Sequence, residues 1–284
     1  MKKTILVIVI FAFATVAQAQ ELLSKKGLPI LPEAKDWSIG FDASPLLKYA
    51  GNFFNHSENN NSLMGYQDSL TLVGLYMKTS TFAYRARVHL SFASQKWTAA
   101  IPDQTNSSLT VNDERNYGQF GITLGLGIQK SRGKGRLRGN YGFEGLVGYF
   151  TSKNTFTYGN EIDENNQTPE STNWAFDYPD PSNPSPGNID SASGKRATAI
   201  DDGSFFGFGA RGFIGAEYFF APKISVSAEY GWSIVFQMST AGEKVEEFWD
   251  GTSLATETQQ TVKKQSLVSN VDNGGGMVAL HVYF

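Results

Sequence analysis

Residues Phe82–Phe92 have the sequence FAYRARVHLSF, and this stretch decides the fold. One set of side chains is apolar, and the other contains two arginines and a histidine: Phe82, Tyr84, Ala86, Val88, Leu90 and Phe92 alternate with Ala83, Arg85, Arg87, His89 and Ser91. Side chains of a β-strand alternate between two faces, whereas a helix would scatter both sets around its circumference. The pattern therefore predicts a strand with one apolar and one polar face.

The same alternation recurs in six further segments, and Leu70–Lys78 is added as a strand because the count needs one there, which gives eight strands. These are Trp37–Tyr49, Leu70–Lys78, Phe82–Phe92, Phe120–Gln129, Leu137–Phe150, Phe205–Phe219, Ile224–Gln237 and Gly276–Phe284. The second, LTLVGLYMK, is apolar on both faces, so its pattern does not assign an orientation. The last strand runs to the final residue, which indicates that something apolar covers one face up to the terminal carboxylate.

Short and long connections between these strands alternate. The short ones are Thr79–Thr81, Ser131–Arg136 and 221–223, and the long ones are Ala50–Ser69, Gln95–Asn116, Thr151–Ser204 and Met238–Gly275. This sorting is typical of an antiparallel up-and-down transmembrane β-barrel, with short turns at one rim and long loops at the other. We expect the third long connection, which is rich in Pro, Asn, Asp and Ser, to be mobile unless a partner orders it. Asp250-Gly251 in the fourth predicts a hairpin, or an extra strand pair that would give ten strands.

The N-terminus has the features of a cleaved secretory signal peptide over residues 1–19. Two lysines precede a short apolar run, and Ala17 and Ala19 form a small-x-small cleavage pattern. Residues 20–36 are then a periplasmic lead-in, and residues 37–284 form the barrel domain. The chain has no cysteine and a formal net charge of −3, which argues against disulfides, thiolate metal sites and a nucleic-acid partner.

The export signal, the strand rhythm, the alternating loops and the ending LHVYF resemble the small outer-membrane β-barrel proteins of Gram-negative bacteria, the OmpA/OmpX-like group. The resemblance covers Trp37–Phe284. It implies a location in the cell outer membrane, in contact with lipid and lipopolysaccharide. It also implies that Leu280, Val282, Tyr283 and Phe284 form the C-terminal signal recognised by the outer-membrane assembly machinery.

The interior of an eight-stranded barrel is just wide enough for side chains to fill it. Alternation places one set of charged or titratable residues inside: Asp42, Lys48, Arg85, Arg87, His89, Arg138, Glu144, Arg211, Glu217 and Glu229, with His281. Unpaired charges there would carry large desolvation penalties. We therefore expect an ion-pair network, with the lining of a selective pore as the alternative.

Aromatic residues gather near the predicted strand ends. They are Trp37, Tyr49, Tyr149, Phe150, Phe205, Tyr218, Phe219 and Trp232. Such positions predict the aromatic girdles that mark the two lipid interfaces of a membrane barrel.

Some small barrels of this kind resemble lipid A acyltransferases and deacylases, so acyl-transfer chemistry has to be considered. Two residue patterns could carry it. One is His56 with Asp68 and Ser69, and the other is His89 with Ser91. Ordinary loop composition and a polar barrel interior explain both, so we predict no catalytic residue, no metal and no cofactor. The favoured function is a structural or interaction protein that presents acidic loops to a surface partner. The alternatives are a passive, porin-like channel for small solutes and, less favoured, a lipid A-modifying enzyme.

Overall fold

The computed structural model describes residues 22–43, 70–133, 135–172, 174, 194–271 and 277–284, and these contain eleven β-strands. The strands are β1 (Trp37–Asp42), β2 (Leu70–Thr79), β3 (Phe82–Pro102), β4 (Thr110–Arg132), β5 (Leu137–Thr157), β6 (Arg196–Ala221), β7 (Ile224–Ser239), β8 (Glu243–Trp249), β9 (Leu254–Gln260), β10 (Gln265–Val271) and β11 (Met277–Tyr283). In this part of the chain, no helix is long and apolar enough to cross a membrane.

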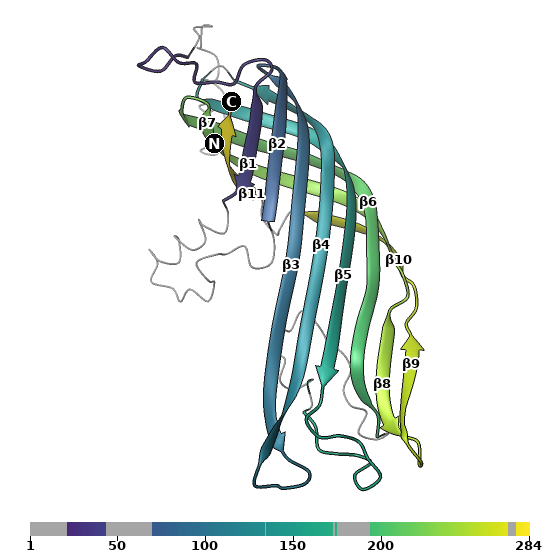
Figure 1. The fold of residues 1–284 in the computed structure, drawn as a ribbon. Coiled ribbons are helices and arrows are strands. Elements are labelled where there is room, and N and C mark those ends of the chain that lie inside the picture. Colours follow the sequence, from purple (N-terminus) through teal and green to yellow (C-terminus); the bar gives the residue numbers. More distant parts are fainter. Residues whose placement is uncertain (1–21, 44–69, 134, 173, 175–193, 272–276) are drawn as a thin grey trace, which may run out of the picture.

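Eight strands form a closed ring, as predicted. Each of β1 to β6 pairs antiparallel with the next strand, β7 pairs with β11, and β11 pairs back with β1 (Figure 1). The backbones of Trp37 and Phe284 exchange two hydrogen bonds of 2.9 Å. The chain therefore carries its alternation to the last residue because that residue closes the ring.

The fourth long connection contains the predicted hairpin. Strands β8 and β9 form a hairpin with its turn at Asp250–Ser253, and β8 also pairs with the first residues of β6. The hairpin extends the sheet beside the ring without entering it, so the ring has eight strands and not ten. Strand β10 pairs with the part of β7 that lies beyond β11.

One rim carries the short connections and the closing pair Trp37 and Phe284, and we call it the turn end. We call the opposite rim the loop end. At the turn end the structure assigns the orientation of β2. Val73, Leu75 and Met77 point into the ring and are buried, whereas Leu72 points outward. Both faces of β2 are apolar because its inward face joins an apolar cluster with Ile30 and Phe219.

Four strands run much further toward the loop end than predicted (Figure 1). Strand β3 continues to Pro102 and β4 begins at Thr110, so only residues 103–109 connect them and the prediction of a loop over Gln95–Asn116 was wrong. The outward apolar alternation ends at Phe92. Beyond it the apolar residues Trp97, Ala99 and Ile101 have the inward parity, so the pattern is inverted but not lost.

The third long connection also differs from its prediction. Strand β5 runs to Thr157 and β6 begins at Arg196, and the segment after β5 packs on the inward face of the extended sheet. The Asn160 side-chain amide donates to the carbonyls of Pro102 and Glu170. Residues 158–172 are therefore held by specific contacts, while residues 175–193 lie outside the described residues.

Three of the predicted girdle aromatics point inward: Phe150 and Phe205 line a cavity, and Phe219 is fully buried. The prediction placed both Tyr149 and Phe150, and both Tyr218 and Phe219, in the girdles. Neighbours along a strand face opposite sides, so only one of each pair can be outward. Tyr49 lies outside the described residues.

Candidate functional site

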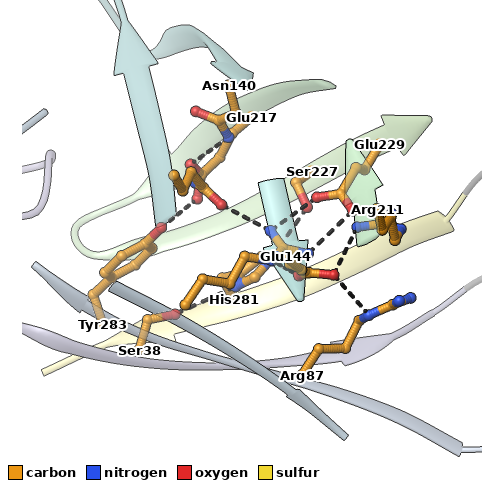
Figure 2. A network of polar contacts seen from close by, with 12 residues as sticks. Ser38, Arg87, Asn140, Glu144, Arg211, Glu217, Ser227, Glu229, His281 and Tyr283 are labelled. Atoms are coloured by element: carbon orange, nitrogen blue, oxygen red, sulfur yellow. Dashed lines mark hydrogen bonds and ion pairs between the residues drawn. The ribbon is translucent and has the colours of Figure 1, made fainter. Parts of the chain in front are cut away.

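Five charged side chains meet in the middle of the ring, each from the inward face of a strand (Figure 2). Glu144 on β5 accepts from Arg85 Nε at 2.5 Å, from Arg87 Nε at 3.1 Å and from Arg211 Nη1 at 3.1 Å. Glu229 on β7 accepts from Arg85 Nη1 at 2.9 Å and from Arg211 Nη2 at 2.6 Å. We call these five residues the charge cluster.

The charge cluster is almost completely removed from solvent. The side chain of Glu144 is 0% exposed and that of Arg211 is also 0% exposed. Gln129 on β4 accepts from Arg85 Nη1 at 2.7 Å, and both Arg85 and Arg211 lie over the ring of Phe213. Shared carboxylates, an amide acceptor and an aromatic face offset the desolvation cost that such burial would otherwise impose.

A second polar layer lies between the charge cluster and the turn end. Glu217 accepts hydrogen bonds from Ser225 Oγ at 2.5 Å, Tyr283 Oη at 2.8 Å and Asn140 Nδ2 at 3.1 Å. His281 lies 3.3 Å from Ser38 Oγ and 3.2 Å from Ser227 Oγ (Figure 2). Arg138 donates to the carbonyl of Ser80 at 2.6 Å.

The structure brings most of the predicted interior set into these two layers. Asp42 is inward and buried, and His89 forms a 2.8 Å hydrogen bond with Thr71 on the neighbouring strand. Lys48 lies outside the described residues. Sequence reasoning missed Gln129, Asn140 and the hydroxyl of Tyr283, because only Asp, Glu, Lys, Arg and His were counted among residues of the inward parity.

The lead-in closes the turn end of the ring. Residues 22–30 turn back on themselves through a bridge between Leu23 and Pro29, and Ile30, 1% exposed, enters the apolar cluster inside the ring. The Lys223 backbone N–H donates to the Ile30 carbonyl at 3.0 Å. The Lys223 ammonium lies 2.8 Å from Asp36, and this hydrogen bond raises the pKa of Lys223. We call residues 22–36 the plug.

Replacement of Ile30 by valine is expected to lower the free energy of unfolding by about 0.5–1.5 kcal/mol, because one buried methylene group is lost. Urea titration of the protein folded in lipid vesicles measures this change. Leu28→Ala, at an exposed position of the plug, is the matched control and should change the value by less than about 0.5 kcal/mol. Equal effects of the two substitutions would contradict the burial of Ile30 in the ring.

On the loop side of the charge cluster lies a cavity of about 170 Å³. Its lining includes Thr123, Leu146, Phe150, Phe205, Val235 and Gln237. The paired glycines Gly148 and Gly207 also line it and leave the space that larger side chains would fill. Leu146 lies directly beside the charge cluster. A Cβ atom built on Gly125 would be 3.2 Å from Leu146 Cδ2 and 3.4 Å from Glu144 Oε2, so both side chains border the same point of the interior.

The structure describes only one of the two predicted acyl-transfer patterns. His56, Asp68 and Ser69 lie outside the described residues, as do Ala17 and Ala19 of the predicted signal. His89 hydrogen-bonds Thr71, and Arg87 next to it belongs to the charge cluster. Within the described ranges, no group of three or more His, Asp or Glu side chains could hold a metal ion.

Neither a protein-family model nor a curated protein sequence matches the chain. Among solved structures, the chain is similar to the outer membrane protein OprG from Pseudomonas aeruginosa. The match has 11% sequence identity, covers 90% of this chain and 98% of the OprG chain, and has a TM-score of 0.30. So loose a superposition supports no residue-level or functional comparison, and the fold rests on the strand pairing described above.

Proposed function

We propose that the protein is a non-conducting outer-membrane β-barrel that presents a folded β-sheet at the cell surface, as a structural or interaction protein. The observation that carries this proposal is the interior of the ring. From the turn end it is filled in turn by the plug, the polar layer around Glu217 and the charge cluster. Such a filled interior favours an anchor over a pore.

The outward face supports insertion in a membrane. Large apolar side chains are exposed on every strand of the ring, and their band ends toward the loop end at Phe92, Phe120, Tyr149 and Phe206. Tyr149 lies next to both Phe120 and Phe206, with ring centroids 6.5 and 5.1 Å apart. Exposed apolar surface of this extent needs a lipid environment. The aromatic residues mark the boundary of the apolar band on the side of the loop end.

Beyond this boundary the sheet continues as a surface structure. Residues 93–102 of β3 alone extend it by about 33 Å. Its inward face has its own core of Phe156, Trp174 and Ala197. Arg115 is buried there between Trp97 and Phe156 and donates to Asn154 Oδ1 at 2.8 Å. This folded extension, together with the acidic connections, is the surface that we propose meets a partner.

Cysteine labelling of intact cells tests the orientation, because the natural chain contains no cysteine. Thr98→Cys, outward on the extension, should react with a membrane-impermeant maleimide. Thr81→Cys, in the β2–β3 turn, should react only after the outer membrane is permeabilised. Labelling of Thr81→Cys alone on intact cells would reverse the orientation, and equal labelling of both would argue against insertion.

A passive channel for small solutes is the second candidate, and the cavity beside Leu146 favours it. It would require the charge cluster and the plug to open. A channel conducts a steady current across a planar bilayer, whereas a filled barrel does not.

A further inference from the structure

The turn end carries exposed basic side chains that take no part in the contacts of the filled interior. Lys78 at the end of β2, Lys130 and Arg132 at the end of β4, and Lys25, Lys26 and Lys35 on the plug are all exposed. In the part of the chain that the structure describes, no carboxylate lies within ion-pair distance of Lys78, Lys130 or Arg132. Lys223 at the same end is different, because Asp36 and Glu33 neutralise it.

Two of these cations border a continuous row of outward aromatic rings. Trp37 lies 4.9 Å from Tyr76, Tyr76 stacks on Tyr84 with centroids 6.4 Å apart, and Phe82 meets Tyr84 edge-on at 5.7 Å. The Lys78 Nζ atom lies 5.9 Å from the centre of the Tyr84 ring. We call these four rings with Lys78 and Lys130 the basic–aromatic rim.

The strand register fixes the place of Lys130 in this rim. On one side Lys130 lies opposite Phe82 of β3, and on the other it lies opposite Tyr141 of β5. Both neighbours have the outward parity, as Lys130 has. Each lysine thus lies beside the last aromatic residues of the apolar band: Lys130 is level with Phe82 and Tyr141, and the Lys78 ammonium group lies near the Tyr84 ring.

We propose that the basic–aromatic rim binds the headgroup of an anionic phospholipid. Tyrosine and tryptophan rings lie at headgroup level at both borders of a membrane barrel. A lysine stem can cover the adjoining apolar surface while its ammonium group reaches the phosphate. Two ammonium groups without a carboxylate partner among the described residues select a headgroup with a net negative charge over a zwitterionic one.

This inference rests on the proposed function, which places the turn end in the periplasmic leaflet of the outer membrane. The lipid preference itself can be measured in symmetric vesicles, where the orientation of the barrel has no influence. Failure of the lipid preference and failure of the cell-surface orientation are therefore separate results.

Fluorescence quenching by spin-labelled lipids provides the test. A bimane group on Ser80→Cys, beside the rim, reports the local lipid in the full-length refolded protein. A bimane on Pro222→Cys is the matched control, at the same end but beside the neutralised Lys223. The quenchers are phosphatidylglycerol and phosphatidylcholine with the same headgroup-proximal nitroxide, at equal mole fraction.

Phosphatidylglycerol is expected to be enriched over phosphatidylcholine at Ser80, by about fivefold for each lysine. The enrichment should be absent at Pro222 and should fall in high salt. Lys78→Gln with Lys130→Gln should abolish it, while Lys96→Gln at the loop end should leave it unchanged. Equal quenching by both lipids at Ser80, or a preference that survives the double substitution, would overturn the proposal.

Discussion

Replacement of Glu144 by glutamine is expected to lower the free energy of unfolding by about 3–5 kcal/mol. The Glu144 carboxylate accepts from three arginines; the side chains of Glu144, Arg85 and Arg211 are at most 2% exposed, and that of Arg87 is 13% exposed. The amide removes the negative charge and leaves Arg85 and Arg211 with the Glu229 carboxylate as their remaining carboxylate partner in the charge cluster. Urea titration in lipid vesicles, followed by tryptophan fluorescence, measures the loss.

Glu114→Gln is the matched control for this prediction. Glu114 forms an exposed ion pair with Lys96 at 2.8 Å on the extension of the sheet. Solvent screens such a pair, so its loss should cost at most about 1 kcal/mol. A loss for Glu144→Gln as small as that for Glu114→Gln would show that the interior is hydrated and that the carboxylate is not a buried partner of the arginines.

Replacement of Leu124 by arginine is expected to cost about 2–4 kcal/mol in a bilayer. Leu124 lies on the outward face of β4, opposite Val88 and Val147 on the neighbouring strands. This position is near the middle of the apolar band, so the guanidinium group would enter hydrocarbon. Val88→Arg should behave in the same way, and folding titrations in vesicles measure both.

Thr98→Arg is the control for the membrane face. Thr98 is outward on the same sheet but beyond the end of the band at Phe92, and arginine there should change the stability by less than about 0.5 kcal/mol. The comparison places the membrane boundary between the two positions. A large cost at Thr98 with none at Leu124 would contradict the assigned boundary.

The ring was predictable because its rule is local. A period of two with one lipid-facing side appears in the residues of seven predicted strands, and the eighth, Leu70–Lys78, was assigned from its place in the order. The extension was missed because only one parity was sought. Beyond Phe92 the strand leaves the apolar band, so Trp97, Ala99 and Ile101 turn inward to a separate core. An inverted alternation in a predicted loop is the signal that would have found it.

The filled interior was predictable in part. Parity places Arg85, Arg87, Glu144, Arg211 and Glu229 inside, but the strand stagger decides which of them meet. Glu217 lies apart from these five, where Tyr283, Ser225 and Asn140 donate to it. The plug was not predictable from the pattern, because its apolar residues follow no strand alternation, and the burial of Ile30 depends on the cluster that the ring creates.

Conductance of the refolded barrel in a planar bilayer tests the central claim most directly. The filled interior predicts no steady current from the natural protein, and leak currents from the Arg85→Ala and Glu144→Ala variants, whose removed side chains open the charge cluster. A steady current from the natural protein, with an ion selectivity that these substitutions change, would contradict the account and make the charged interior the lining of a channel.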